Sequence, residues 1–460
     1  MNSVKPSGAT TKQLPHSSPK PSANEPAART SEGWLEAVET LAIWLHEPQK
    51  ADDLIDAVAT EAGIKGFARN RQQALVFGVL RHKTTLETEL NKWISRPPRP
   101  KSWATLLVAV FQLAEAESDE QRAKIVHHAV EQMKKILSTP ELGLVNAVLR
   151  KVAGSDGVTT LLTPGIKTAE TAVSIARNFS HPKWLVKRWL DNHGRDATLA
   201  LLAWNQQASP TYLHWLSDEK PTFTEALAPS QWANYYSINH EGWPQARKAL
   251  TEGKAIVQDP FARIPVDLLG IRPGQSVLDL CAAPGGKSRL LASRLAGDPL
   301  SLLVSVDLPG KRVEMLLQSM THANGIKSNV LGADVRTMNA DTFTSRNLPV
   351  EYDAVLLDAP CSNTGVIRRR PDVKWRLTPK AVTEIAMIQQ ELLKNAASFV
   401  RMGGLLAYST CSLEKEENEA IVDAFLQSTQ GAFVLKGSQA SQPWRDGHDG
   451  GGAFVLERVR

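Results

Sequence analysis

The sequence predicts two fold classes in one chain: an all-helical domain followed by an α/β domain built around a mostly parallel sheet. Between Trp34 and about Lys151 the apolar residues recur at the spacing of a helix face. From about Gly270 short apolar runs alternate with helical patterns, which is typical of βαβ units. At 460 residues the chain is long enough for two or three domains that each bury a core.

Composition and cysteine usage narrow the class of protein. With 42% hydrophobic and 22% charged residues the chain has a globular composition, and its net charge of +5 is compatible with a polyanionic partner. No apolar run reaches the ~18 to 20 residues that span a bilayer, and the N-terminus lacks a secretory pattern. We therefore expect a cytoplasmic protein without membrane association. The cysteines, Cys281, Cys361 and Cys411, form neither a disulfide framework nor a metal pattern, so we expect reduced thiols and no metal.

The N-terminal third divides into a tail and a helical domain. Residues 1–32 are rich in Ser, Pro, Thr and Lys, so we expect a disordered tail; their prolines and shortage of arginine argue against a targeting peptide. Residues 33–160 should form the helical domain, interrupted by the basic, proline-containing stretch SRPPRPK. Its apolar positions are Trp34, Val38, Leu41, Leu45, Leu75, Val76, Val79, Leu80, Ile125, Ala129, Val130 and Met133. It is either a plain helical bundle or a bundle that binds RNA through basic loops.

Residues 161–255 should bridge the two domains and bind RNA. The stretch SHPKWLVKRWL sets Lys183, Lys187 and Arg188 among two tryptophans, a mixture that holds phosphates and stacks bases. Alternatively, Trp184 and Trp189 pack against a neighbouring helix, and the charges form a solvated face.

Residues 256–460 should form the α/β domain, which binds ligands at the carboxyl ends of its strands. The expected strands are SVLDLC, LSLLVSVD, YDAVLLD and GLLAYST, and the expected helices are KSRLLASRLA, KRVEMLLQSMTHA and AVTEIAMIQQELLKNAASFV. The first strand runs into a turn of small residues, DLCAAPGGKSRL, where Gly285 and Gly286 let the backbone approach a ligand. A P-loop is excluded because Cys281 stands where that motif needs glycine, and the lack of Gly-x-Gly-x-x-Gly weakens a dinucleotide site.

Two carboxylates follow the next strands. Asp307, in SVDLPG, can accept both hydroxyls of a ribose, and Asp334, in LGADVR, can accept the exocyclic amine of an adenine. Each aspartate alone is more often a turn former or a helix cap. Together with the glycine turn, in this order, they favour an adenosine-containing cofactor.

Two cysteines also lie at strand ends. Cys361 follows Asp358 in DAPCSNTG, and Cys411 ends the last expected strand in YSTCS. A single cysteine in such a place is usually a small buried hydrophobe. Two of them on the edge that binds the cofactor favour thiol chemistry.

These stretches resemble two known families. QALVFGVLRHKTTLETELNKWI, LLVAVFQLAEAE and LVNAVLRKV, within residues 34–155, resemble the helical RNA-binding or protein-docking domain of NusB. CAAPGGKS, DAPCSNTG and YSTCS resemble the motifs of S-adenosylmethionine-dependent RNA cytosine-C5 methyltransferases, and GVIRRRPDVKW is most similar to the bacterial small-subunit ribosomal RNA enzymes of the Sun/Fmu type. The implied fold is a NusB-like domain followed by a Rossmann-like class I methyltransferase domain.

The resemblance implies a role for each motif residue. The loop that wraps the cofactor consists of Cys281, Ala282, Ala283, Pro284, Gly285, Gly286 and Lys287. Asp307 holds the ribose, Asp334 the adenine, and Asp358 the cofactor edge or the target cytosine. Cys411 is the implied nucleophile, and Cys361 is implied to help release the product.

The resemblance also implies the substrate and partners. The protein should methylate carbon 5 of a cytosine in RNA, with 16S ribosomal RNA as the expected target, through a covalent adduct between a cysteine and carbon 6. The RNA backbone is expected to be clamped by Arg368, Arg369, Arg370, Lys374 and Arg376. The alternatives are a transfer RNA target and a non-catalytic RNA-binding factor for ribosome assembly. A DNA enzyme would not need Cys411, so we expect no DNA substrate, and we expect a monomer.

One stretch departs from the family pattern. Leu213, His214, Trp215 and Leu216 stand where the family commonly carries Leu-Arg-x-Asn. The missing Arg and Asn put in doubt the positioning of RNA by the bridging segment.

Overall fold

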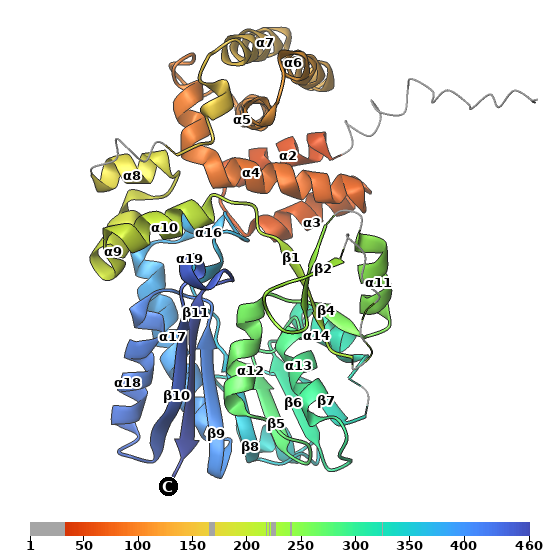
Figure 1. The fold of residues 1–460 in the computed structure, drawn as a ribbon, viewed down its shortest axis with the longest axis vertical. Helices are drawn as coiled ribbons and strands as arrows, with labels where there is room; N and C mark the ends of the chain where they lie inside the picture. Colours follow the sequence, from red (N-terminus) through yellow and green to blue (C-terminus); the bar gives the residue numbers. More distant parts are fainter. Residues whose placement is uncertain are drawn as a thin grey trace, which may run out of the picture.

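The computed structural model describes residues 33–460 apart from 165–170, 218, 220, 222–226, 240, 241 and 324, so the tail expected at 1–32 lies outside the described residues. Its elements form a helical part, a bridging part and an α/β part, with the bridging part between the other two (Figure 1). The two predicted fold classes are confirmed. No helix in the described ranges is both long and apolar enough to cross a bilayer.

The helical part is a bundle around one core. Its elements are α2 (Trp34–His46), α3 (Ala51–Glu61), α4 (Phe67–Leu90), α5 (Pro100–Glu115), α6 (Asp119–Met133), α7 (Thr139–Ala153) and the 3-10 turn η1 (Val158–Thr160). SRPPRPK separates α4 from α5, and Pro100 occupies the first position of α5, where its missing N–H leaves no helical hydrogen bond unmade. The core contains Trp34, Leu41, Val76 and Leu107, so the helical spacing read from the sequence is confirmed.

A kink in α4 joins the helical part to the α/β part. At His82 the backbone leaves the helical range, with φ −109° and ψ 16°. A kink interrupts the helical hydrogen-bond ladder, so nearby carbonyls can accept from other groups. Here Trp375 Nε1 donates to Leu80 O at 2.7 Å and Lys374 Nζ donates to Arg81 O at 2.8 Å. Both donors come from the α/β part, which is therefore attached to the backbone of α4.

The bridging part contains helices and a small antiparallel sheet that the sequence did not predict. Its elements are α8 (Ala172–Asn178), α9 (Lys183–His193), α10 (Arg195–Asn205), β1 (Thr211–Trp215), β2 (Leu227–Pro229), β3 (Tyr235–Ile238), α11 (Trp243–Thr251) and β4 (Ala255–Val257), with the strands in the order β2-β3-β1-β4. Trp189 is fully buried, and Arg188 pairs with Glu414 and Glu416 of the α/β part. Packing, the alternative to RNA stacking, is therefore confirmed for Trp189.

The α/β part is a seven-stranded sheet with helices on both faces (Figure 1). Its strands are β5 (Ser276–Leu280), β6 (Leu302–Asp307), β7 (Lys327–Gly332), β8 (Tyr352–Asp358), β9 (Val400–Thr410), β10 (Phe433–Ser441) and β11 (Gly451–Arg458), in the order β10-β11-β9-β8-β5-β6-β7. Its longer helices are α12 (Ile264–Leu269), α13 (Gly286–Leu295), α14 (Lys311–Met320), α17 (Pro379–Ala397) and α18 (Glu419–Ser428). Shorter ones are η4 (Pro260–Arg263), α15 (Ala340–Thr344), η5 (Thr364–Val366), α16 (Val373–Arg376), η6 (Lys415–Glu417) and α19 (Pro443–Asp446).

Alternate residues of the strands pack on opposite faces of this sheet. Leu278 and Leu280 belong to the core that includes α17 and α18, whereas Val277 belongs to the core that includes α12 and α13. The neighbours from β9 through β7 are all parallel, whereas β11 pairs antiparallel with both β9 and β10. The strands and helices expected at 276–410 are confirmed, and the β10–β11 hairpin was not predicted.

Candidate active site

The parallel register brings the predicted motifs to one edge of the sheet. Leu280 pairs with Val306 on one side and with Leu357 on the other, and Asp358 pairs with Ser409. The last residues of these strands, and those that directly follow them, therefore lie side by side. They include Cys281, Asp307, Asp358 and Cys411, as the sequence predicted.

The sulfurs of Cys361 and Cys411 are neighbours at this edge. The two Sγ atoms are 3.1 Å apart, and Cys411 Sγ lies 3.2 Å from Asn363 Oδ1. All three cysteines are free and partly buried. The hydrogen bond to Cys411, together with burial, raises the pKa of the Cys361 thiol well above its usual range. Cys361 therefore keeps its proton at neutral pH.

Backbone hydrogen bonds hold the two cysteine loops against each other. Ala359 N donates to Ser409 O at 2.9 Å, and Gly365 N donates to Cys411 O at 3.0 Å. Only glycine fits at position 365, because a Cβ there would lie 2.2 Å from Gly450 O and 2.9 Å from Cys411 O. The backbone of the two loops therefore brings the cysteine residues close together.

This geometry predicts that mild oxidation joins Cys361 to Cys411. Diamide would take up two electrons and two protons as the thiols form a disulfide, and the count of free thiols under denaturing conditions should fall from the 3 in the sequence to one. Cys281 should remain free, since burial raises its pKa and suppresses its thiolate. Peptide mapping identifies the linked residues. A Cys281-containing disulfide, or three remaining thiols, would contradict the prediction.

Lys287 and Asp358 form an ion pair beside the cysteine loops. Lys287 Nζ lies 2.6 Å from Asp358 Oδ2, and Ser409 Oγ donates to Asp358 Oδ1 at 2.8 Å. Burial acts to lower the pKa of Lys287, but the charge and the hydrogen bond of Asp358, together with other acidic groups nearby, outweigh it, and the pKa is raised. The lysine is therefore a cation held at the sheet edge. Behind it, burial raises the pKa of Asp279 to about 7, although Ser288 donates to that carboxyl.

The carboxylate of Asp307 organises the glycine turn. It accepts from Ala283 N and Leu308 N, each at 2.8 Å, and from Arg312 Nε at 2.6 Å and Nη2 at 2.9 Å. It is 3% exposed, whereas half of the Arg312 side chain is exposed. A carboxylate offers about four acceptor positions, so the hydroxyls of a ribose would displace Arg312, the partner that can turn into solvent.

A buried donor beside this turn supports a polar ligand there. Gln258 is 8% exposed, and its Oε1 accepts from Tyr235 OH at 3.1 Å and lies 2.8 Å from His214 Nδ1. Its Nε2 has no hydrogen-bond partner among the described residues and lies 3.4 Å from the position of a Cβ on Gly286. Because a buried amide without a partner is costly, this donor fits a ligand carboxylate at the turn. Sequence reasoning missed Gln258, which stands just before the short helix η4.

The five residues predicted to contact RNA differ in their exposure and in their partners. Arg370 is exposed, with its Nε 3.8 Å from Asp52 Oδ2, and Arg368 is partly exposed with its guanidinium 4.0 Å from the ring of Trp204. Lys374 is fully buried and donates to Arg81 O. The expected RNA contact by Lys374 is therefore wrong for this conformation, because the side chain has no exposed surface.

The remaining two of the five are engaged with carboxylates. Arg369 pairs with Asp259 at 2.7 Å and Asp449 at 2.9 Å, and Arg376 pairs with Asp372 at 2.8 Å. Their charges are neutralised within the protein, so they order the fold around the site. Asp334, predicted to bind adenine, similarly pairs with Arg336 at 2.7 Å.

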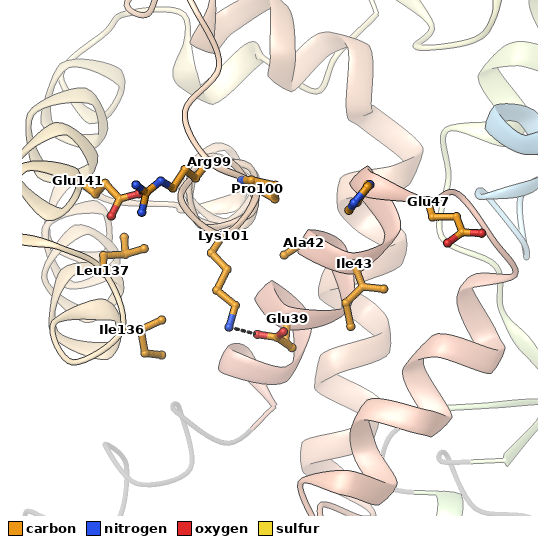
Figure 2. A pocket seen from close by; sticks show the side chains of 11 residues that line it. Glu39, Ala42, Ile43, Glu47, Arg99, Pro100, Lys101, Ile136, Leu137 and Glu141 are labelled. Carbon is orange, nitrogen blue, oxygen red and sulfur yellow. Dashed lines mark ion pairs between the residues drawn. The ribbon is translucent and has the colours of Figure 1, made fainter.

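A hollow of about 470 Å³ lies on the helical part and not at the strand ends. In Figure 2 Lys101 points to Glu39, with Nζ 2.8 Å from the carboxylate, and Ile43 and Ile136 line the hollow from opposite sides. None of the predicted site residues lines it. We assign no chemistry to this hollow.

Comparison with protein families agrees with this architecture. The family described as 16S rRNA methyltransferase RsmB/F matches residues 266–444, and the NusB family matches residues 35–154. The first match includes Cys361, Cys411 and the glycine turn at 281–287.

Curated proteins and solved structures are similar over most of the chain. Ribosomal RNA small subunit methyltransferase B of Salmonella arizonae is 33% identical over 409 residues, covering 84% of this chain and 90% of that protein. The protein of the same name in Citrobacter koseri is 32% identical and covers 81% and 85%. The crystal structure of PH0851 covers 93% of this chain and 98% of its own at 20% identity, with a TM-score of 0.73. A methyltransferase homolog from Pyrococcus horikoshii covers 62% and 98% at 19% identity, with a TM-score of 0.51. These structures share the fold.

Proposed function

The chain belongs to the 16S rRNA methyltransferase RsmB/F family, and from this premise we propose that it methylates carbon 5 of a cytosine in 16S ribosomal RNA. The observation that carries the proposal is the sulfur pair of Cys361 and Cys411, 3.1 Å apart at the carboxyl edge of the sheet. Methylation at carbon 5 requires one thiol for attack and a second group for release. The proposal includes a cytoplasmic monomer as the active species.

The proposed reaction proceeds by addition and elimination. The Cys411 thiolate forms a bond to carbon 6 of cytosine, and the electron pair of the 5,6 double bond moves to carbon 5, which then forms a bond to the methyl group. S-adenosylmethionine, the cofactor of this family, would supply that methyl group as an electrophilic sulfonium, and its sulfur would keep the electron pair of the broken bond as a neutral thioether. The proton on carbon 5 is then removed, the double bond re-forms, and the bond from sulfur to carbon 6 breaks.

The state of Cys361 supports its role in release. Its raised pKa leaves it protonated in the resting protein, so it does not compete with Cys411 as the nucleophile. When Cys411 is bonded to carbon 6, its hydrogen bond with Cys361 is lost, and with it the largest cause of the raised pKa of Cys361. Cys361 can then release its own proton to solvent and, as a thiolate, take up the proton from carbon 5.

Lys287 and Asp358 are proposed to hold the base. A carboxylate in an ion pair is an acceptor, so Asp358 suits the exocyclic amine of cytosine. Lys287 stays protonated because its pKa is raised, so it can donate to N3 or O2 of the ring and favour addition at carbon 6. Asp307, Asp334, Gln258 and the loop 281–287 are proposed to hold the cofactor. Among the basic residues, the exposed Arg370 and the partly exposed Arg368 are proposed to contact the RNA backbone.

The proposal predicts 5-methylcytosine in 16S ribosomal RNA. Purified protein, S-adenosylmethionine and unmodified ribosomal RNA should yield one product nucleotide, measured by mass-spectrometric mapping. The same map from cells that lack the protein should have lost that nucleotide. Loss from transfer RNA alone would instead establish the transfer RNA alternative, which shares every motif.

A non-catalytic assembly factor is the second candidate function. Such a factor would have no use for two adjacent thiols, so the pairing of Cys361 with Cys411 would serve no function in it. Cofactor binding without methyl transfer to any RNA or assembling subunit would establish this alternative.

A further inference from the structure

A buried glutamate ties the two cysteine loops together. Glu417, at the end of η6, is fully buried. One carboxylate oxygen, Oε2, accepts from the backbone N of Ser362 at 2.8 Å. The other, Oε1, accepts from Ser412 Oγ at 2.6 Å. Ser362 and Ser412 are the residues directly after Cys361 and Cys411, so one side chain spans both loops.

Gln389 extends this tie to the other side of Cys361. Its Nε2, on α17, donates to Glu417 Oε2 at 3.0 Å and to Pro360 O at 2.9 Å. The backbone of the first cysteine loop is therefore held both before and after the sulfur-bearing residue. Tyr408 OH donates to the backbone O of Glu417 at 2.7 Å, which anchors η6 to β9.

Burying the carboxyl of Glu417 costs electrostatic free energy, which suggests that this side chain serves to position the two loops. The donors to the Glu417 carboxylate are a backbone amide, a hydroxyl and an amide side chain, all of them neutral. Burial raises the pKa of Glu417, and the hydrogen bonds offset that effect only in part. A buried carboxyl without a cationic partner contributes little to stability by its charge. What the Glu417 side chain does provide is its length and two acceptor oxygens, one for each cysteine loop.

We propose that Glu417 is a positioning residue that sets the spacing of Cys361 and Cys411 by holding Ser362 and Ser412 on its two carboxylate oxygens. The catalytic effect of this spacing rests on the proposed function: it would govern the transfer of the carbon 5 proton to Cys361 during release. The spacing itself does not depend on the substrate, so it can be measured without RNA or cofactor.

Two variants separate the length of the side chain from its charge. Glu417→Gln keeps the length, and its Oε1 can accept from Ser362 N and Gln389. Its Nε2 can donate to the lone pair of Ser412 Oγ that does not accept from Glu414 N, while the hydroxyl hydrogen of Ser412 turns to Ser362 Oγ at 3.0 Å. Glu417→Asp keeps the charge but is one methylene too short to reach both loops. If the role is spacing, the Gln variant should resemble the wild type and the Asp variant should not.

The first measurement is the rate at which diamide joins Cys361 to Cys411. We expect the Asp variant to be slower by about tenfold, because loosened loops lower the effective concentration of the thiols, and the Gln variant to remain within about threefold of wild type. The second is the rate at which free methylated RNA, separated from the covalent adduct by denaturation, appears in a single turnover. The Asp variant should lose about tenfold or more in this rate with an unchanged KM for S-adenosylmethionine.

The two measurements give distinguishable failures. If no variant and no wild type methylates RNA, the proposed function fails while the cross-linking rates still test the spacing. A Gln variant as slow as the Asp variant, or an Asp variant as fast as wild type, overturns the inference. Should the Asp variant not fold, as judged by thermal unfolding, Ser412→Ala removes one arm of the tie. That variant should also cross-link several-fold more slowly, and a wild-type rate overturns the inference.

Discussion

Replacing Cys411 with alanine is expected to abolish methyl transfer and to prevent any covalent complex with RNA. Without a thiolate at carbon 6, carbon 5 stays too electron-poor to attack the methyl group, so the rate should fall by at least about 1,000-fold. The measurement is single-turnover methylation, together with denaturing gel electrophoresis of protein mixed with labelled RNA and S-adenosylmethionine. Cofactor binding should be retained, because the side chain of Cys411 lies outside the turn at 281–287.

Folding of the Cys411→Ala variant is the control for this experiment. Cys411 is only partly buried, and loss of its sulfur removes the contact with Cys361 and the one with Asn363. A thermal midpoint close to that of the wild type would show that the lost activity is chemical. A variant that still traps RNA covalently would contradict the assignment of Cys411 as the nucleophile.

Replacing Cys361 with alanine is expected to have the opposite effect on the covalent complex. Attack by Cys411 is still possible, but the group that takes up the proton from carbon 5 is gone, so the adduct should accumulate. A slowly migrating band on a denaturing gel, dependent on RNA and S-adenosylmethionine, measures it. Turnover should fall by about 100-fold or more, the usual contribution of a positioned acid or base.

The paired variants decide between the two cysteines. If Cys361→Ala turns over normally while Cys411→Ala traps RNA, the roles are reversed. The double variant should form no adduct, because release is irrelevant when attack fails. Its rate should equal that of Cys411→Ala alone.

The α/β part was largely readable from the sequence because its rules are local. Each parallel strand is a short apolar run whose last residues carry the motif, so the sequence alone places Asp307, Asp358 and Cys411 at one edge of the sheet. The distance between the cysteine sulfurs could not be read in this way. It depends on backbone hydrogen bonds between loops 50 residues apart in sequence and on the absence of a side chain at Gly365.

Charged residues were the hardest to place. Lys374, in the basic run expected to grip RNA, is fully buried, and Arg369 is shared by two carboxylates from distant segments. A sequence shows the charge of a side chain but not its partner. The sequence did not predict Glu417 or Gln258 for a related reason. Glu417 matters through the hydrogen bonds it accepts, and Gln258 through a buried Nε2 that has no partner in the described part of the chain.

The kink at His82 limits how the protein can be dissected. Lys374 and Trp375 donate to the carbonyls of Arg81 and Leu80, and Lys374 lies wholly inside the junction. Cutting the chain near residue 160 to obtain the α/β part alone would strand an ammonium and an indole whose acceptors had been removed. The helical part therefore contributes to the folded structure of the α/β part. A chimera in which another RNA-binding domain replaces it would need to keep the kinked turn of α4.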